Sequence, residues 1–175
     1  MRVLITGAGS YLGGAILGAL RKQGVEADEL DVRGALPEKA FQGYDRVVHV
    51  AGIAHRKETP ENRPLYEQVN HRLAVEIARA AKAQGVRQFV FFSTMSVYGK
   101  VTGRITADTQ PDPKNAYGAS KWAAEQEIAA LADEHFAVAV LRPPMIYGKG
   151  CRGNYQSLRR LILKTPMFPR CGNQR

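Results

Sequence analysis

The sequence predicts an α/β fold in which a doubly wound parallel sheet carries helices on both faces. Short apolar segments typical of buried strands alternate with longer segments of helical periodicity. The first of these strands runs directly into a glycine-rich turn and an amphipathic helix, the order found in a βα unit. A length of 175 residues with 45% hydrophobic content suffices for one buried core. The predicted strands lie near residues 2–6, 25–31, 45–51, 87–93 and 136–142.

The turn after the first strand is the first candidate binding site. It reads Thr6-Gly7-Ala8-Gly9-Ser10-Tyr11-Leu12-Gly13-Gly14. Glycine lets a backbone turn tightly and approach a pyrophosphate, and the N-terminus of the following helix favours negative charge. The dinucleotide pattern Gly-x-Gly-x-x-Gly would need glycine at position 12, which is Leu12. The turn by itself therefore indicates a phosphate site or a ligand-free βα turn with similar weight.

The middle of the chain predicts a packed helix and a long loop. Residues 64–84 carry apolar side chains at four-residue spacing and end at Gly85, as a helix with a glycine stop should. We expect these apolar positions to lie in the core: Leu65, Val69, Leu73, Ile77 and Ala81. Residues 100–115 are rich in Thr, Gly, Asp, Pro and Asn, which predicts a loop before the next helix.

That next helix carries Tyr117 and Lys121, four residues apart and therefore on one face. A tyrosine normally titrates near ~10 and is a poor base at neutral pH, but a nearby cation stabilises the phenolate. The same spacing also occurs by chance on ordinary solvated helix faces. The pair lies downstream of the predicted strand that ends in Ser93-Thr94-Met95-Ser96, which adds hydroxyl groups to a candidate site.

The glycine turn and the Tyr117/Lys121 pair together resemble the short-chain dehydrogenase/reductase superfamily, in its extended, NAD-dependent epimerase/dehydratase branch. Three further segments are similar to that branch: the strand 45–52 with its His-x-Ala ending, the strand and turn 89–99 ending Ser-Val-Tyr-Gly, and the segment 141–148. The resemblance covers about residues 1–150 and implies a Rossmann-like domain.

The resemblance assigns catalytic roles to three residues. Tyr117 would be the acid/base that exchanges a proton with a substrate hydroxyl, and Lys121 would lower the pKa of Tyr117 and hold the nicotinamide ribose. Thr94 would hydrogen-bond the reacting oxygen, with Ser93 and Ser96 as alternatives. Without the resemblance, Thr94 would be interpreted as a strand-end hydroxyl that satisfies backbone groups.

The resemblance also implies the dinucleotide site. Asn70 would face the nicotinamide, although alone it would be interpreted as a surface amide. The four histidines form no ligand pattern, so no metal site is expected. The residues expected to bind cofactor are Gly7, Gly9, Ser10, Tyr11, Leu12, Gly13, Asp31, Val32, Arg33, Val50, Ala51, Gly52, Asn70, Ser93, Tyr117, Lys121 and Pro143.

One departure from the family lies between Asp31 and Asp45. Only 13 residues separate them, too few for the strand and helix that the family places there, so the second βα unit should be shortened. In the family an acidic residue at the end of the second strand holds the adenosine ribose. A carboxylate there favours NAD because it repels the 2′-phosphate of NADP, whereas Arg33 could attract that phosphate. We expect NAD, with NADP as the alternative.

The substrate prediction depends on the segment after residue 141. Nucleotide-sugar epimerases of this branch usually show Arg-Pro-x-Asn-x-Tyr-Gly, and here Met145 replaces the asparagine that touches the substrate phosphates. Either Arg152 or Asn154 takes over the anionic group, or the substrate is not a nucleotide sugar; the basic stretch 149–155 could equally be a solvated loop. The predicted substrate-binding residues are Thr94, Ser96, Tyr117, Met145, Arg152 and Asn154.

The net charge of +9 is concentrated near the C-terminus. Residues 135–175 contain no Asp or Glu but eight Lys and Arg residues. An anionic substrate, a missing acidic neighbour and a nucleic-acid surface would each explain this, and the last is the weakest because no stacking aromatics or nucleic-acid motif accompany the charges. Two cysteines without metal-site spacing, no secretory signal and no apolar run near ~18 residues predict a cytoplasmic location and no membrane span.

The domain prediction is a dinucleotide-binding domain over residues 1–150 and the start of a truncated substrate-binding region over 151–175. Members of the family usually continue into a C-terminal domain, so we expect a fragment. The expected function is that of an NAD-dependent nucleotide-sugar epimerase/dehydratase-type enzyme similar to UDP-glucose 4-epimerase. The alternatives are an NAD(P)H-dependent sugar or carbonyl reductase or dehydrogenase, and a non-enzymatic dinucleotide-binding module or inactive fragment. By analogy with the family, a homodimer could form through the helices near 64–84 and 115–133.

Overall fold

The computed structural model describes the chain except for residues 55–57, 101, 152–153 and 166–175. It contains two compact units, Met1–Pro144 and Met145–Arg175. The first unit carries the sheet, and the second carries a single described helix.

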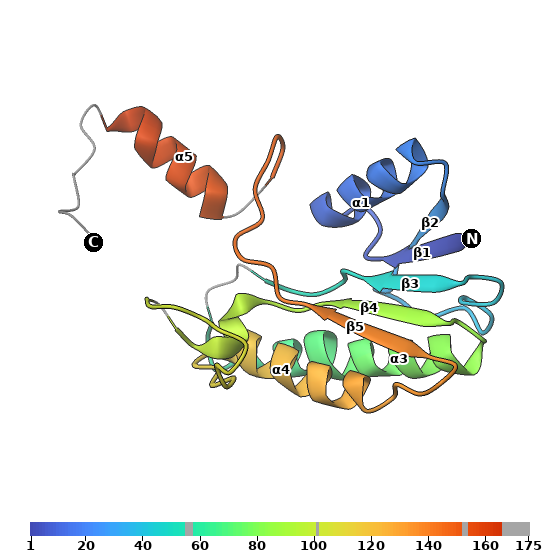
Figure 1. The fold of residues 1–175 in the computed structure, drawn as a ribbon. Helices are drawn as coiled ribbons and strands as arrows, with labels where there is room; N and C mark the ends of the chain where they lie inside the picture. Colours follow the sequence, from blue (N-terminus) through green and yellow to red (C-terminus); the bar gives the residue numbers. More distant parts are fainter. Residues whose placement is uncertain (55–57, 101, 152–153, 166–175) are drawn as a thin grey trace. The chain divides into compact units, whose positions relative to one another are not determined.

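The sheet has five parallel strands in the order β2-β1-β3-β4-β5 (Figure 1). This confirms the predicted doubly wound architecture, because successive connections run outward in both directions from β1 and β3. Each predicted strand is present, the first with the predicted bounds and the other four with slightly shorter ones. The strands are β1 (Arg2–Thr6), β2 (Glu26–Leu30), β3 (Arg46–His49), β4 (Gln88–Phe92) and β5 (Ala137–Leu141).

The shortened second unit is also confirmed. Between β2 and β3 the chain forms neither helix nor strand, so β2 is an edge strand of the sheet. A side chain of the β2–β3 loop fills part of this space: Phe41 is 1% exposed and packs into the main core. The Gln84 side chain fixes this loop, because its Oε1 accepts from the Phe41 N–H at 2.9 Å and its Nε2 donates to the Glu38 carbonyl at 3.0 Å.

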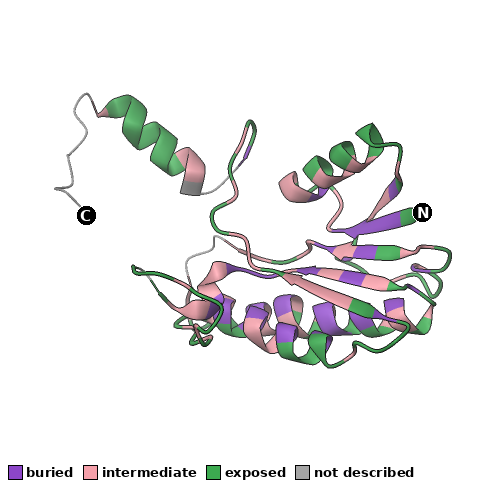
Figure 2. Cartoon of the chain, viewed as in Figure 1, coloured by how far each residue is buried: buried purple, intermediate pink, exposed green. Residues whose placement is uncertain are grey.

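Helices cover both faces of the sheet, with α1 (Tyr11–Lys22) on one face and α3 (Leu73–Ala83) and α4 (Ala116–Ala129) on the other (Figure 1). The core accordingly has two parts. A small cluster joins Val3, Ile5 and Ala27 to apolar residues of α1. The larger cluster, purple along the sheet and the inner faces of α3 and α4 in Figure 2, gathers side chains that alternate with the first set along the strands, as the pleat requires.

The predicted helix 64–84 is broken into three pieces, which corrects part of the core prediction. These are α2 (Arg63–Tyr66), a π-helical turn η1 (Glu67–Arg72) and α3. The π turn inserts an extra residue and rotates the buried face. Tyr66 and Asn70 are therefore buried, whereas Leu65 and Val69 are only partly buried; Ile77 and Ala81 lie in the core as predicted.

The second unit contains α5 (Asn154–Lys164), a helix with basic and apolar residues. Its exposed large apolar side chains are Leu158, Leu161, Ile162 and Leu163. Among the described residues, no helix is both long and apolar enough to cross a membrane.

Candidate active site

The carboxyl ends of the five parallel strands meet at one edge of the sheet, where a groove opens between β1 and β3. These two strands are the switch point of the sheet, the place where α/β folds bind ligands. The groove has a volume of about 1000 Å³. It is lined by residues of four segments, namely 7–10, 31–34, 50–53 and the helical stretch from Pro64 to Glu76.

The glycine turn forms the floor of this groove at the start of α1. Gly7 has φ +98°, and a Cβ there would lie 3.0 Å from the Ala51 N and 3.1 Å from a Val50 methyl carbon, so only glycine fits. Ser10 caps α1, since its Oγ accepts from the Gly13 N–H at 3.0 Å. Of the predicted loop residues, Gly7, Gly9 and Ser10 line the groove, whereas Tyr11, Leu12 and Gly13 lie in the first turn of α1.

One end of the groove presents an ion pair at the end of β2. The Arg33 Nη2 donates to the Asp31 Oδ2 at 2.5 Å, and the Arg33 Nε lies 2.9 and 3.0 Å from the two carboxylate oxygens. These hydrogen bonds lower the pKa of Asp31 to about 2. Both side chains are well exposed, at 48% for Asp31 and 84% for Arg33. Val32 between them is buried and also lines the groove.

Tyr117 and Thr94 meet at the other side of the same sheet edge. Tyr117 is the second residue of α4, and Thr94 caps the short 3₁₀ helix η2 (Met95–Tyr98) that follows β4. Burial raises the pKa of Tyr117, and a hydrogen bond with the Thr94 side chain opposes that rise. Tyr66 adds a second phenol, with its ring centroid 6.3 Å from that of Tyr117. The geometry thus brings together two of the three predicted catalytic residues.

Lys121 is buried on the same helix, but its partner differs from the expected one. Its Nζ donates to the carbonyl of Phe92, the last residue of β4, at 2.9 Å and lies 4.7 Å above the Phe91 ring. Burial lowers the pKa of Lys121 to about 8, and the Glu125 carboxylate opposes this. In this structure the ammonium of Lys121 is held by the carbonyl at the end of β4, and its effect on the pKa of Tyr117 stays a prediction.

The predicted serine and threonine hydroxyls after β4 differ in their hydrogen bonds: Thr94 and Ser96 are bonded to each other, and the Ser93 hydroxyl is not bonded within the described residues. The Thr94 Oγ1 donates to the Ser96 Oγ at 3.2 Å and accepts from the Ser96 N–H at 3.1 Å. Ser93 is 5% exposed, and its Oγ is among the few buried polar atoms of the described residues without a hydrogen bond. Ser93 is therefore available to a ligand or water at the carboxyl end of β4.

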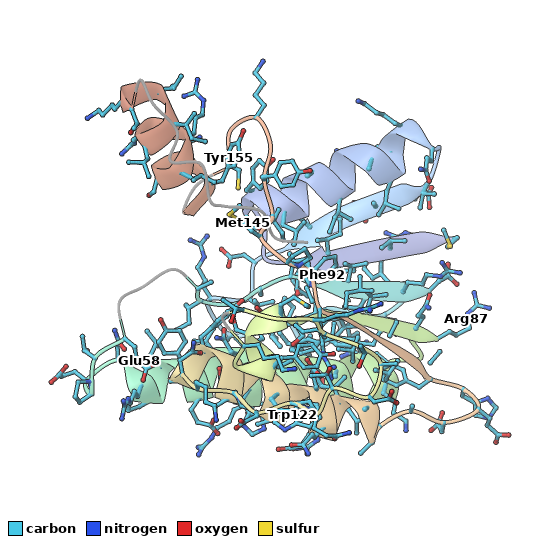
Figure 3. All side chains as sticks on the ribbon, turned by 60° about the vertical axis from the view of Figure 1, so that its left-hand side comes forward. Glu58, Arg87, Phe92, Trp122, Met145 and Tyr155 are labelled. Atoms are coloured by element: carbon cyan, nitrogen blue, oxygen red, sulfur yellow. The ribbon has the colours of Figure 1, made fainter. Side chains whose placement is uncertain are left out.

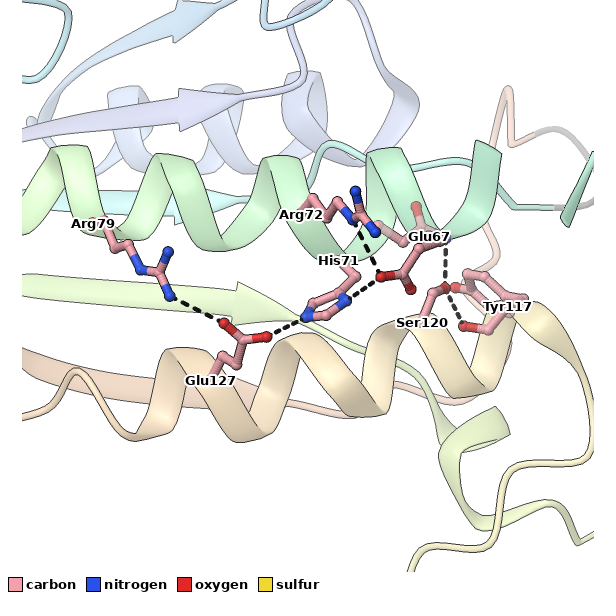
Figure 4. A network of polar contacts seen from close by, with 8 residues as sticks. Glu67, His71, Arg72, Arg79, Tyr117, Ser120 and Glu127 are labelled. Carbon is pink, nitrogen blue, oxygen red and sulfur yellow. Dashed lines mark hydrogen bonds and ion pairs between the residues drawn. The ribbon is translucent and has the colours of Figure 1, made fainter. Parts of the chain in front are cut away.

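Asn70 is buried in the π turn and clamps the wall of the groove. Its Oδ1 accepts from the Ile53 N–H at 2.8 Å, and its Nδ2 donates to the Ile53 carbonyl at 3.0 Å and to the Ser120 Oγ at 3.4 Å. The Ser120 Oγ in turn donates to the Tyr117 carbonyl at 2.9 Å, the link drawn in Figure 4. The contact of Asn70 with a nicotinamide stays a prediction, and in this structure Asn70 joins the wall residue Ile53 to the Tyr117 helix.

A charged network joins the π turn to α4 on the side away from the sheet (Figure 4). His71 lies between two carboxylates, with its Nδ1 2.8 Å from the Glu67 Oε1 and its Nε2 2.6 Å from the Glu127 Oε1. Arg72 and Arg79 extend the network at its ends. The network fixes η1, and with it Asn70, against the helix that carries Tyr117.

His49 faces the core rather than the groove. Its Nδ1 lies 2.7 Å from the Thr6 Oγ1, and its ring stacks on Phe89 and Phe91. Complete burial lowers the pKa of His49 to about 3, so the ring is neutral. Among the described residues, no group of three or more His, Cys, Asp or Glu side chains is placed to hold a metal ion.

The predicted site residues after β5, namely Pro143 for the cofactor and three residues for the substrate, are only partly described. The Pro143 carbonyl accepts from the Met95 N–H at 3.4 Å, which places Pro143 beside η2. Met145 begins the second unit and is 47% exposed. Arg152 lies outside the described residues, and of Asn154 only its place at the start of α5 is described.

Sequence reasoning missed two groups of residues. The helical wall of the groove, which includes Glu67, Arg72 and Glu76, was obscured by the unrecognised π turn. The second is Glu125, whose buried carboxylate pairs with the Arg142 Nη2 at 2.5 Å. A signal for Glu125 exists in the sequence, because it lies four residues after Lys121 and so on the same helix face.

Comparison with known proteins agrees with this geometry. The family model "NAD dependent epimerase/dehydratase family" matches residues 3–165. A UDP-glucose 4-epimerase from Vibrio cholerae is 37% identical over 129 residues, which cover 70% of this chain and 39% of that protein. A UDP-2-acetamido-2,6-beta-L-arabino-hexul-4-ose reductase from Pseudomonas aeruginosa is 30% identical over 162 residues, covering 90% of this chain and 39% of that protein.

Among solved structures, MoeE5 in complex with UDP-glucose and NAD has a TM-score of 0.81 at 28% identity, covering 95% of this chain and 61% of that one. The match confirms the Rossmann-like fold. The chain spans 39% of each of the two curated relatives and 61% of MoeE5.

Proposed function

Because the chain belongs to the NAD dependent epimerase/dehydratase family, we propose that it forms the dinucleotide-binding part of a nucleotide-sugar epimerase-like enzyme of the short-chain dehydrogenase/reductase type. The observation that carries the proposal is the convergence of Tyr117 and Thr94 at the same sheet edge as the glycine-floored groove. UDP-glucose 4-epimerase relatives and the UDP-glucose complex of MoeE5 support a nucleotide sugar as substrate.

The residues of the groove fit a nicotinamide dinucleotide. The backbone at Gly7 leaves no room for a side chain, and the first turn of α1 presents N–H groups to a pyrophosphate. The Asp31 carboxylate at the end of β2 matches the adenosine ribose, and Val50 and Ala51 line the floor between the two ends. When bound, the cofactor supplies the hydride acceptor and donor of the reaction.

Tyr117 is the proposed acid/base for a substrate hydroxyl. The Thr94 hydroxyl, which lowers the pKa of Tyr117, is the proposed second group to bind the same reacting oxygen. Burial disfavours the phenolate, so abstraction of a proton needs a compensating positive charge. Lys121 is the proposed source, and this role requires its Nζ to exchange the Phe92 carbonyl for a position nearer the phenol or the cofactor ribose.

NAD is the proposed cofactor, with NADP and a reductase activity as the alternative. Asp31 favours NAD, and the NAD complex of MoeE5 supports it. Arg33 favours the alternative because its guanidinium is 84% exposed and could pair with a 2′-phosphate, and a sugar reductase is among the relatives. A homodimer through α3 and α4 stays a proposal that rests on analogy with the family.

The proposal is tested by denaturing the purified chain and identifying any released dinucleotide by mass spectrometry, followed by calorimetry with added NAD and NADP. We expect NAD at near-stoichiometric amount or NAD binding in the calorimeter. Preference for NADP would replace the epimerase proposal by the reductase. A folded chain that binds neither dinucleotide would contradict both.

A further inference from the structure

A carboxylate is buried on the Tyr117 helix, one turn beyond Lys121. The Glu125 side chain is 3% exposed, and the Arg142 guanidinium meets it as a fork. The Arg142 Nε lies 3.1 and 3.0 Å from the two carboxylate oxygens, and its Nη2 lies 2.5 Å from the Oε2. A buried carboxylate held in this way has one defined orientation.

Arg142 also connects a third element. Its Nη1 donates to the Tyr98 hydroxyl at 2.6 Å, and its guanidinium lies over the rings of Tyr98 and Trp122, with centroid distances of 5.0 and 5.5 Å. Trp122 belongs to α4 and is labelled in Figure 3. Arg142, the residue that follows β5, therefore links α4 to the last residue of η2.

This link acts on the segment that carries Thr94. Thr94 caps η2, and Tyr98 ends it. The residue before Thr94 is bonded to the end of β5, since the Ser93 N–H donates to the Leu141 carbonyl at 2.7 Å. The segment also lies against α4 without room for a side chain, because a Cβ at Gly118 would be 2.6 Å from the Ser96 carbonyl oxygen. The distance between Thr94 and Tyr117 thus depends on how η2 is held to α4.

The charged and titratable groups that act on Lys121 among the described residues are few. Glu125 on its own helix favours the charged form of Lys121, and the Lys121 ammonium in turn helps to lower the pKa of His49 of β3. Glu125 is thus the carboxylate that favours the charged form of Lys121.

We propose that Glu125 and Arg142 are positioning residues of the active site. The pair holds the Thr94 turn against the Tyr117 helix, and the Glu125 carboxylate balances the ammonium of Lys121. The chemical use of this arrangement rests on the proposed function, whereas the arrangement itself does not.

The first test compares Glu125→Gln with Glu127→Gln, a control on the same helix whose carboxylate faces Arg79 and His71 instead. The titration midpoint of Lys121 is read in the full chain from the ¹³Cε signals of labelled lysine, assigned with Lys121→Met. We expect the midpoint to fall in Glu125→Gln and to stay at the wild-type value in Glu127→Gln. An unchanged midpoint in a folded Glu125→Gln variant would overturn the role of Glu125.

The second test uses Arg142→Lys, which keeps both charges but loses the fork and its reach to Tyr98. Backbone amide signals of residues 93–99 report the position of the Thr94 turn. We expect these signals to shift while those of β1 and α1 stay in place, and the Lys121 midpoint to move less than in Glu125→Gln. If the signals of residues 93–99 do not move, the role of Arg142 is overturned. This test does not depend on whether the Glu125→Gln variant folds.

Binding of NAD is measured on the same samples by calorimetry. Wild-type protein that binds no dinucleotide would contradict the proposed function, while the lysine midpoints and amide signals would still decide the role of the pair. The two failures are therefore distinguishable.

Discussion

Two regions at the carboxyl edge of the sheet, the turn after β2 and the buried polar groups beneath α4, differ in how their charges are held. At the end of β2, Asp31 and Arg33 form an exposed pair two residues apart in sequence. At the ends of β3, β4 and β5, the polar groups His49, Lys121 and Glu125 are almost fully buried. Exposed charges are screened by water and contribute little to stability, whereas buried ones couple protonation to folding. The first region should therefore set ligand preference, and the second should link catalysis and stability to pH.

The largest expected effect is in the buried region. In a form of the enzyme that turns over substrate, Tyr117→Phe removes the proposed acid/base and should lower turnover by about 10²–10⁴-fold. The groove floor at Gly7 and Ser10 is untouched, so NAD affinity should stay near the wild-type value. Steady-state kinetics and calorimetry on the same preparation check this. Unchanged turnover would remove Tyr117 from the mechanism.

His49 should make the fold sensitive to acid. Its pKa is about 3 in the folded chain against 6.5 for the unfolded reference, so the unfolded chain binds the proton first as the pH falls. Stability should decline between pH 6.5 and 3 by at most about 1.4 kcal/mol per pH unit from this group. Urea unfolding at several pH values compares wild type with His49→Gln. The exposed His135→Gln is the control and should follow wild type.

Lys121 should make stability depend on pH in the alkaline range. Its folded pKa of about 8 lies below the unfolded 10.5, so the folded chain loses the proton first as pH rises. Stability should increase between pH 8 and 10.5 by about 3 kcal/mol relative to Lys121→Met, from the size of the pKa difference. Denaturant unfolding of both proteins across this range measures it. Parallel stability curves for the two proteins would show that the ammonium is solvated in the folded chain.

The smallest effects on stability are expected in the exposed region. Arg33→Ala and Asp31→Asn should leave the unfolding midpoint almost unchanged, since neither side chain is buried. Arg33→Ala should weaken NADP binding about tenfold, the size of one charge-assisted contact, and spare NAD. Calorimetry with both dinucleotides measures the ratio. A loss of NAD affinity in Arg33→Ala would show that the pair orients Asp31 for the ribose.

Local signals sufficed for the elements and for the pairs that are near in sequence. The five strands, the glycine turn and the short connection after β2 follow from apolar runs, glycine spacing and a count of residues. The helix 64–84 shows the limit of prediction from local signals. Its four-residue apolar spacing predicts a regular helix, but the π turn at Glu67–Arg72 rotates the face and buries Asn70 in place of Val69.

Sequence by itself determined the family, the doubly wound sheet, the floor of the groove and the placement of Tyr117 and Lys121 on one helix. The tertiary structure decided which atoms these side chains meet. Lys121 bonds the Phe92 carbonyl, and Glu125 reaches Arg142 across 17 positions of the chain. The physical reason is that such pairings depend on the strand order, which brings the ends of β4 and β5 beneath α4, and on burial, which no local pattern records.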